Sequence, residues 1–370
     1  MGCLLDLVAR CNDYILEGVS GAQDWLPLRR KTDGQQFVGQ VLSLGDGRTW
    51  LDRLLTAGHI DPPPGQDSDA DNDNDSNTFY RALQRLLRHD NLVSIAAFVA
   101  VQLLESVTAQ VAVVWDRCDA GSLDVLLHDL PRMAEMGVYR GVVGCRDEGT
   151  VYLPESLCWH VVRSVLRALS WLHDGDGNPV QDGWMPVLHN AVQPANIFFQ
   201  HPRGRETYGL CKLGNYSRCF VSGHIVGPHA RRSLAMKPPV ALAAAPNPLS
   251  VQANDLVTRG TDMAALGEVL HHMMTGRPWT SAARKLDDQH NEARDKDVAT
   301  DANAGLEGQT EAEDGDKYTH QLELFRRRLL QFADLQNCPA EAGTAAMLLE
   351  QARLGFEAWR SSTLDGRQHV

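Results

Sequence analysis

Strand patterns and helix patterns occupy different parts of this 370-residue chain. Before residue 119, QQFVGQVLSL (35–44) alternates after a Thr-Asp-Gly turn, and AQVAVVWDRC (109–118) is an apolar run typical of a buried strand. Helical spacing of apolar residues dominates the rest of the chain. A group of strands followed by a group of helices is typical of an α+β fold. The order predicts two lobes, a small β-rich N-terminal lobe and a larger helical C-terminal lobe.

Four long segments of the second part carry the helical pattern. In residues 153–175, apolar side chains recur at helical spacing up to a final glycine, which predicts a helix and its end. Residues 261–279 form a second apolar segment, which we expect to end at Gly276. We expect two further helices within residues 320–335 and 343–359.

Changes in composition predict how the chain is divided. Residues 1–13 are an amphipathic N-terminal helix or extension, residues 14–118 the first lobe and residues 119–370 the second. Two polar, acidic segments interrupt the lobes, at 61–77 and at about 282–316, and both lack apolar periodicity. Such segments are typically disordered. We interpret them either as solubilising linkers or as docking segments for a partner.

Charge and cysteine content exclude several classes of function. The net charge of −12 argues against a general nucleic-acid binder, because such proteins carry a basic patch. The 8 cysteines form no Cys-x-x-Cys pair and no zinc-type spacing with histidine, which favours an intracellular protein of the cytoplasm or nucleus. No apolar run is long enough for a membrane span. Asp6 in the opening MGCLLD stands where a myristoylation pattern requires Ser or Thr.

Two local patterns suggest metal ligands, but neither has the full set of residues. The acidic segment 61–77 has aspartates at the alternating spacing of a calcium loop. However, Asn74 replaces the required glycine and Tyr80 the closing glutamate. His271 and His272 are adjacent on one helix and therefore point in different directions. We expect no metal at either place.

Six short motifs follow one another in an order that is typical of one family. Together they resemble a eukaryotic protein kinase domain, and locally the NIMA-related protein kinases. The resemblance covers roughly residues 14–280 and implies a two-lobed protein-kinase-like fold. The motifs match the second and third strands, the end of the C-helix, the hinge, the catalytic loop, the magnesium loop and the F-helix: LRRKTDGQQFVGQV, LLRHDNLV, VVWDRCDAGSLDVLL, LHNAVQPANIFF, CKLGNYSRC and GTDMAALGEVLHHMMTGRPW.

The resemblance implies charged groups around the phosphates of ATP, which this chain lacks. Phosphoryl transfer needs charge near the phosphates, metal ions held by carboxylate and amide groups, and an acid that accepts the hydroxyl proton. Gly18 matches the first glycine of the phosphate-covering loop. Gln40 stands at the third-strand lysine, and Tyr80 at the C-helix glutamate that pairs with it. Both halves of that ion pair are absent together, so no buried charge is left without its partner.

The catalytic-loop motif keeps its two ends and changes the positions between them. His189 matches the family histidine, and Asn196 matches a magnesium-ligand position. Asn190 stands for the arginine that reads an activation-loop phosphate. Ala191 stands for the catalytic base, and Gln193 for the lysine that steadies the γ-phosphate.

The next loop has Asn215, Tyr216 and Ser217 where kinases have Asp-Phe-Gly. Asn196 and Asn215 therefore put two neutral amides at the metal-facing positions. An amide oxygen brings no charge and is a weaker ligand for Mg²⁺ than a carboxylate. The resemblance thus implies at most a vestigial metal site, and we expect neither ATP nor Mg²⁺ as a cofactor.

Two tryptophans match positions around the adenine of ATP. Trp115 aligns with the gatekeeper beside the nucleotide pocket, and Trp25 with the second-strand residue that covers the base. Together with Gly18 and Asn196, Trp115 marks a vestigial nucleotide pocket. Each indole either fills that pocket or packs elsewhere in the core, as large aromatic side chains commonly do.

Positions that the resemblance assigns to the scaffold are retained. Asp262 matches the F-helix aspartate that hydrogen-bonds the catalytic-loop backbone, and His189 and Tyr216 match a packed column that joins the lobes. We therefore expect a pseudokinase, a non-catalytic binding or allosteric scaffold for an unidentified protein partner. The alternative is a weakly active, atypical ATP-dependent Ser/Thr protein kinase. Neutral residues stand at five catalytic positions: Gln40, Tyr80, Ala191, Gln193 and Asn215.

One feature outside these motifs is a basic run. ELFRRRLL (323–330) lies within the predicted helix 320–335. We interpret its arginines as a solvated basic face of that helix.

Overall fold

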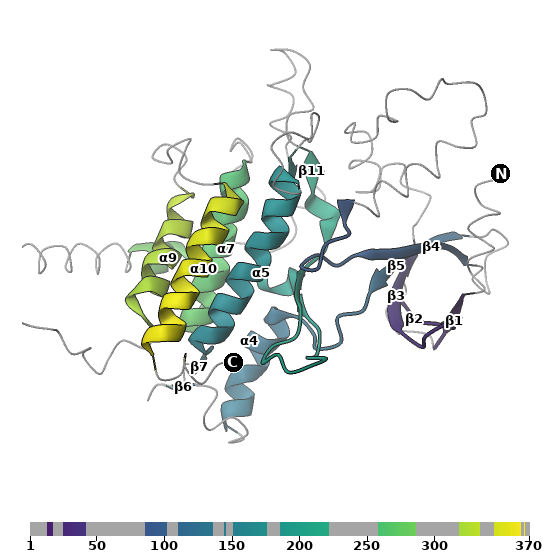
Figure 1. Cartoon of the computed structure of the whole chain (residues 1–370), viewed down its shortest axis with the longest axis horizontal. Coiled ribbons are helices and arrows are strands. Elements are labelled where there is room, and N and C mark those ends of the chain that lie inside the picture. The colour runs from purple at the N-terminus through teal and green to yellow at the C-terminus, as the bar shows by residue number, and fades with distance from the viewer. Residues whose placement is uncertain are drawn as a thin grey trace, which may run out of the picture.

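In the computed structural model, the chain is a mixed α+β protein. A curled antiparallel sheet comes from the first part of the chain and the long helices come from the second (Figure 1). The prediction of an α+β fold is confirmed at this level. The described residues are 13–17, 25–41, 86–101, 110–135, 144–145, 151–175, 186–221, 258–285, 318–333, 344–363 and 366.

The first part of the chain folds into a five-stranded antiparallel sheet. A tight turn joins its second and third strands, and Gly34 in this turn adopts φ +71°. That conformation favours glycine because it has no Cβ. Asp33 closes the same turn by accepting two hydrogen bonds from the Arg30 guanidinium, at 3.0 and 2.5 Å. The strand order is β1 (Tyr14–Leu16), β2 (Trp25–Arg30), β3 (Gln36–Val41), β5 (Gln110–Asp116) and β4 (Ile95–Val101).

Both faces of this sheet bury apolar side chains. Because successive residues of a strand point to opposite faces, β5 contributes to two clusters. Val113 and Trp115 face the main core, which continues into the helices. Ala112 and Val114 face a smaller cluster within the sheet lobe, completed by Leu26, Leu28, Phe37, Ala97 and Val99.

The helices of the second part pack around α5. Its buried face contacts α10 and α7, and α9 packs against α7 (Figure 1). Trp159 of α5 is fully buried, and a Cβ on Gly355 of α10 would lie 2.6 Å from its ring, so glycine permits this close approach. The helices are α4 (Leu123–Glu135), α5 (Glu155–Asp174), α7 (Arg259–Thr275), α9 (His320–Gln331) and α10 (Ala345–Ser362).

Short strands and turns connect the sheet with the helices. The connecting segment 187–221 lies between α5 and α7 in the sequence, and its strand β10 (Cys211–Leu213) contacts α5. Leu213 of β10 also forms a parallel bridge with Leu92, which precedes β4. Two further short strands, β6 (Gly144–Cys145) and β7 (Val151–Tyr152), pair with each other. The connecting segment contains β8 (Val187–Leu188), η1 (Pro194–Asn196), β9 (Ile197–Phe199), β10 (Cys211–Leu213), η2 (Tyr216–Arg218) and β11 (Phe220–Val221).

The four predicted helices are present in the structure, and the two predicted glycine ends agree, whereas α10 continues to Ser362, beyond the expected segment 343–359. Gly175 follows α5 and donates its backbone N–H to the carbonyl of Trp171. Gly276 follows α7 with φ +68°, the left-handed conformation typical of a C-terminal glycine. These ends could be predicted because each glycine is the first residue after the apolar pattern stops.

Two predictions need correction. Residues 281–285 are helical, although the expected disordered insertion begins at about 282; Thr280 starts this turn by accepting the Ala283 N–H through its hydroxyl. The basic face of α9 is only partly solvated, because Arg326 is buried. Its guanidinium pairs with Glu323 at 3.0 Å and reaches His271 at 3.3 Å.

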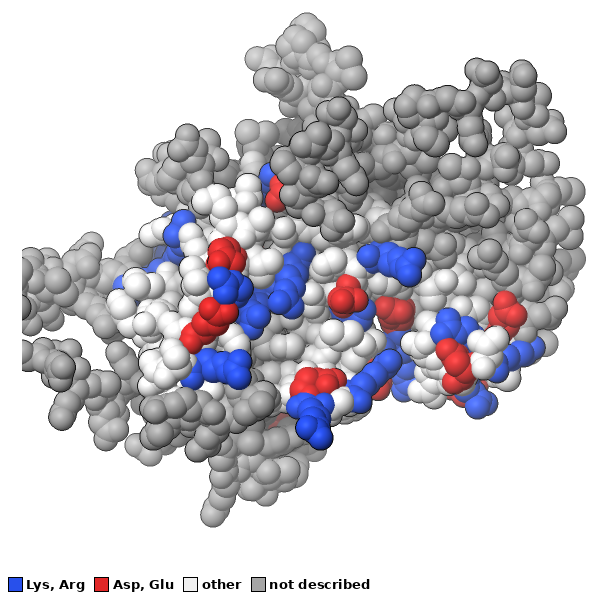
Figure 2. Space-filling model, in the orientation of Figure 1, with Lys and Arg blue, Asp and Glu red and all other residues white. Residues whose placement is uncertain are grey.

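On the face of the molecule seen in Figure 2, acidic and basic side chains of the described residues alternate. On α10, Arg353 pairs with both Glu350 and Glu357 at 2.6 Å.

No helix within the described ranges is both long and apolar enough to cross a membrane. The predicted insertion at 61–77, and residues 286–316 of the second one, lie outside the described residues.

Candidate functional site

The loop from His189 to Asn196 runs from β8 into β9 and is held from behind by α7. Asp262, in the first turn of α7, accepts the backbone N–H of His189 at 2.8 Å and that of Asn190 at 2.7 Å. Its carboxylate also lies 2.9 Å from Nε2 of His173, the histidine near the end of α5. We call Asp262, His173 and His189 the anchor cluster. This is the kind of contact that the kinase resemblance implies for Asp262.

The anchor cluster is buried and contains a carboxylate. Asp262 is 1% exposed, and both histidines are fully buried. Burial by itself raises the pKa of Asp262, but hydrogen bonding and charge from His173, together with the His189 N–H, bring that pKa below its usual value. A buried carboxylate is stable only when such donors surround it. The cluster therefore fixes the loop backbone with a charge that is fully compensated.

His189 is held in its neutral form. Its Nε2 lies 3.1 Å from the carbonyl oxygen of Gly214, so this nitrogen carries the proton and donates. Burial lowers the pKa of His189 to about 4, because the imidazolium form would lose its hydration. The ring also contacts Tyr216 edge-on, with centroids 5.8 Å apart. His189 therefore joins the loop to the next motif by packing and one hydrogen bond.

The front of the loop carries only neutral groups. Asn215 donates through Nδ2 to Oδ1 of Asn196 at 2.9 Å, and Asn196 donates through its own Nδ2 to the carbonyl of Ala191 at 2.8 Å. The Ser217 hydroxyl donates to Oδ1 of Asn215 at 2.8 Å. We call Asn196, Asn215 and Ser217 the amide cluster. Both amide oxygens that would face a metal ion accept a hydrogen bond within the protein.

The amide cluster does not fit a magnesium ion. Mg²⁺ needs oxygen ligands in octahedral geometry, at least one of them normally a carboxylate. In the described chain, the side chains of Asn196 and Asn215 have only amide, hydroxyl and carbonyl partners. No group of three or more His, Cys, Asp or Glu side chains in that part of the chain could hold a metal ion. We therefore derive no chemical step through a metal at this site.

The backbone at Asn215 explains why an asparagine suits this position. It adopts φ +62° and ψ +76°, in the left-handed region. Asparagine and aspartate enter this region more readily than other residues that carry a Cβ. The same holds for Asn190, at φ +53°. Both loops thus use asparagine where the chain turns sharply.

Gln40 and Trp115 form a second neutral contact beneath the sheet. The indole N–H of Trp115 donates to Oε1 of Gln40 at 3.2 Å, and the indole ring is 6% exposed. Its centroid lies 5.8 Å from that of Tyr216, with the ring planes tilted by 30°. The Tyr216 hydroxyl in turn donates to the carbonyl of Val93 at 2.7 Å. The residue that the resemblance aligns with the third-strand lysine is therefore hydrogen-bonded to the residue that it aligns with the gatekeeper.

The other predicted site residues are less informative. Ala191 and Gln193 contribute backbone carbonyls, which accept from the Asn196 side chain and the Asn196 N–H respectively. Trp25 begins β2, and its backbone pairs with Gln40. Gly18 and Tyr80 lie outside the described residues.

Two polar contacts near the site were not predicted. His173 joins the anchor cluster from α5, and Lys212 forms an ion pair with Asp116 at 3.2 Å. A signal for Lys212 exists in the sequence, since it lies between Cys211 and Leu213 in an apolar strand. No comparable signal marks His173, because a histidine in the last turn of a helix is common.

Comparison with models of known protein families gives no match for this chain. A search of curated proteins also gives none. The site is therefore described by its own residues: a charged, buried anchor cluster behind the loop and a neutral amide cluster in front of it.

Proposed function

We propose that this chain is a degenerate relative of the eukaryotic protein kinases that acts as a non-catalytic binding or allosteric scaffold for another protein. The observation that carries the proposal is the hydrogen bond from Asn215 Nδ2 to Asn196 Oδ1. The resemblance assigns both residues to metal-ligand positions, and here the two neutral side chains bond each other.

Loss of charge in the site supports the absence of phosphoryl transfer. Most of the rate enhancement in such a reaction comes from preorganised charge around the transferred phosphoryl group. The loop offers the methyl group of Ala191 where a catalytic base is needed and the neutral Gln193 where a lysine is needed. Gln40 and Asn215 also lack the required charge, which makes four such positions among the described residues. Restoring the charge at one of them would leave the other three neutral.

The buried indole supports a site without nucleotide. Trp115 contacts both Gln40 and Tyr216 and is almost fully buried, and the resemblance assigns this indole to the gatekeeper position beside the nucleotide pocket. Moving the indole would break its hydrogen bond to Gln40 and expose apolar surface. ATP would therefore have to displace part of the core.

The anchor cluster supports a scaffold role. It keeps the loop backbone in place through Asp262 without using any residue of the amide cluster. Apart from the Asn196 bond to the Ala191 carbonyl, this anchoring of the loop does not use the groups that would perform chemistry. A protein selected for binding a partner needs this shape and does not need the catalytic charges.

Thermal unfolding with ATP and Mg²⁺ tests the proposal. A ligand that binds only the native state raises the Tm according to its concentration and Kd. We expect wild-type protein to shift by less than about 1 °C at roughly millimolar ATP, with or without Mg²⁺. We also expect no transfer of the γ-phosphate to a general substrate protein.

Two variants distinguish the reasons for this result. Trp115→Val removes the indole from the proposed pocket, and Trp171→Val removes a half-buried indole of α5 that donates to the carbonyl of Leu86 and stacks on His89. ATP should stabilise only the Trp115 variant, each protein being compared with its own Tm in buffer. If wild-type protein shows Mg²⁺-dependent stabilisation and phosphate transfer, and Asn196→Ala abolishes both, then the alternative of a weakly active kinase replaces the scaffold proposal.

A further inference from the structure

Within the described residues, one short segment connects the sheet with the long helices. The strands of the five-stranded sheet precede residue 117, and the described helices α4, α5, α7, α9 and α10 follow residue 122. The connection 117–122 contains Gly121 at φ +79° and has no helix or strand of its own. Such a single, short connection does not by itself fix the angle between two parts. Non-covalent contacts beside it must do so.

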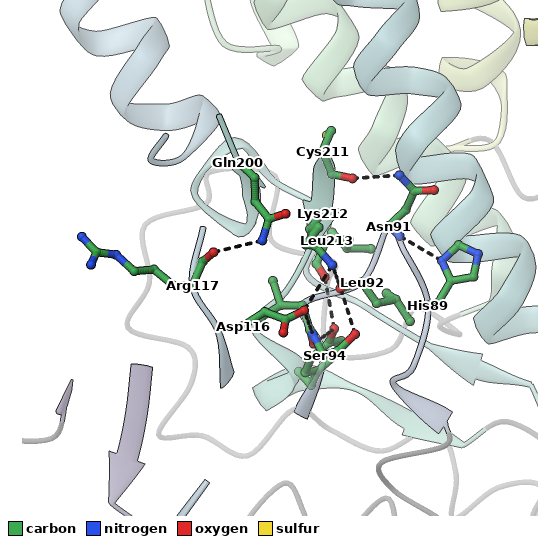
Figure 3. A network of polar contacts seen from close by, with 12 residues as sticks. His89, Asn91, Leu92, Ser94, Asp116, Arg117, Gln200, Cys211, Lys212 and Leu213 are labelled. Carbon is green, nitrogen blue, oxygen red and sulfur yellow. Dashed lines mark hydrogen bonds and ion pairs between the residues drawn. The ribbon is translucent and has the colours of Figure 1, made fainter. Parts of the chain in front are cut away.

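Backbone contacts beside this connection bring the segment before β4 onto β10 (Figure 3). Leu213 donates its N–H to the carbonyl of Asn91 at 2.8 Å, and Val93 donates to the carbonyl of Leu213 at 2.9 Å. The Asn91 side chain adds a bond to the carbonyl of Cys211 at 2.9 Å. We call these contacts the junction. It links a segment of the sheet lobe with a strand that packs on α5.

An ion pair between a buried lysine and a partly buried aspartate lies in the middle of the junction. The Lys212 ammonium, on β10, lies 3.2 Å from the Asp116 carboxylate and donates to the carbonyl of Leu92 at 3.1 Å (Figure 3). The two side chains are 6% and 21% exposed. Asp116 is the last residue of β5, and Ser94 donates its N–H to the same carboxylate oxygen at 3.4 Å. The pair thus connects the end of the sheet with β10.

Because Lys212 is buried, its ammonium is stable only while its partners stay in place. A buried ammonium needs a carboxylate partner and hydrogen-bond acceptors, because it has lost its hydration. Rotation of the sheet relative to β10 would separate the charges while they are still largely shielded from water. A pair of this kind contributes little net stability but favours one arrangement over others.

We propose that Lys212 and Asp116 form a latch that holds the sheet and the helices in one orientation. Gln200 adds a second contact: its Nε2 donates to the carbonyl of Arg117, the first residue of the connection, at 3.0 Å. None of these contacts uses the amide cluster or Gln40. The latch therefore goes beyond the proposed function and does not depend on it.

Hydrogen exchange of the full chain tests the latch. The variant Lys212→Met with Asp116→Leu replaces both charges by apolar groups of similar size, which usually preserves stability. We expect the amides of Val93 and Leu213 to exchange at least roughly tenfold faster than in wild type, because local opening of the junction becomes easier. Amides in the middle of α5 and α7 should keep their wild-type rates.

The single variant Lys212→Met supplies an independent readout. It leaves the partly buried Asp116 carboxylate without its lysine, and we expect the folding equilibrium constant to fall on the order of tenfold. The double variant should recover most of that loss. Arg353→Met with Glu350→Leu replaces an exposed pair on α10 in the same way and should leave junction exchange unchanged.

Three outcomes would overturn the latch. The first is wild-type exchange of the Val93 and Leu213 amides in the double variant. The second is an equal acceleration in α5 and α7, since the pair would then affect general stability and not orientation. The third is a Lys212→Met protein as stable as the double variant, because the carboxylate would then not depend on the lysine.

Discussion

The two sides of the loop 189–196 differ in charge and burial. Behind it, the anchor cluster contains a buried carboxylate that accepts three hydrogen bonds, from His173, His189 and Asn190. In front of it, the amide cluster contains only neutral groups, and its outer member Asn215 is exposed while Asn196 is buried. A charge in the first position is costly to leave unpaired, whereas a hydrogen bond in the second is readily replaced by water.

The shape of the loop therefore depends mainly on the buried side, and its chemistry depends on the side chains in front. The carboxylate behind the loop organises backbone N–H groups and would do so whatever side chains stand in front. Of the residues in front, Asn196 holds the loop through its bond to the Ala191 carbonyl, whereas the Asn215 and Ser217 side chains bond only within the amide cluster. Substitutions on the two sides should therefore have very different effects on stability.

Removing the carboxylate of the anchor cluster should have the largest effect. In Asp262→Ala, the N–H groups of His189 and Asn190 lose their acceptor inside the protein. We expect the free energy of unfolding to fall by about 3–5 kcal/mol, as when one partner of a buried charged network is lost. Urea denaturation measures this. Glu350→Ala, which removes an exposed carboxylate on α10, is the control and should leave stability close to wild type. An equal effect of the two substitutions would contradict the distinction between buried and exposed charges.

Acid should weaken the anchor cluster through His189. The pKa of its imidazole is about 4 in the folded protein, below the usual 6.5, so the unfolded chain binds more protons between these values. Stability due to His189 is therefore fully present above about pH 6.5 and is lost as the pH falls towards 4. We expect a loss of about 2 kcal/mol between pH 7 and pH 5.

The His189 contribution is isolated by comparison with a variant. Burial raises the pKa of Glu268 to about 7, which gives a pH dependence of opposite sign. The difference between wild type and His189→Phe removes this background. If denaturation curves of the two proteins shift in parallel between pH 7 and pH 5, His189 is not the titrating group.

A smaller effect should follow from breaking the contact beneath the sheet. Gln40→Leu removes the oxygen that accepts the Trp115 indole N–H. We expect a loss of about 1 kcal/mol, the usual net contribution of one hydrogen bond. Gln36→Leu alters a neighbouring glutamine of β3 whose side chain is exposed, and it should cost less. Unfolding followed by tryptophan fluorescence checks both. No loss in Gln40→Leu would separate Gln40 from the core contacts of Trp115.

The amide cluster should be the most tolerant region. Asn215→Gly loses the bond to Asn196 but suits φ +62°, so we expect a change of less than about 1 kcal/mol. Asn215→Ala loses the same bond and adds left-handed strain, so it should be about 1 kcal/mol less stable than the glycine variant. Equal stability of the two variants would show that backbone conformation does not select the residue here.

The sequence predicted the elements better than their contacts. The helices α5 and α7 were predictable because apolar residues recur along their length and a glycine ends each one. The start of the insertion near residue 282 was placed too early because residues 281–285 (Ser-Ala-Ala-Arg-Lys) have no large apolar residue and form only a short helical turn. Arg326 was assigned to a solvated face because the basic run gives no indication that His271 and Glu323 surround it.

The candidate site was predicted only as a set of positions. Resemblance to the kinases brought His189, Asn196, Asn215 and Asp262 into one hypothesis. It did not indicate that Asn196 and Asn215 would bond each other. Nor did it indicate Lys212 and Asp116, because each has an ordinary charge and they are far apart in the chain.

The sequence by itself determined the α+β order of strands and helices, their glycine ends and the neutral residues in the loops. These features depend on local periodicity and backbone preference, and both are set by residues that lie close together in the sequence. The tertiary structure alone decided that an amide bonds an amide in front of the loop, that Asp262 meets His173, and that Lys212 meets Asp116 across the junction. Such pairs form because burial removes water and leaves each polar group dependent on whichever partner the fold brings near.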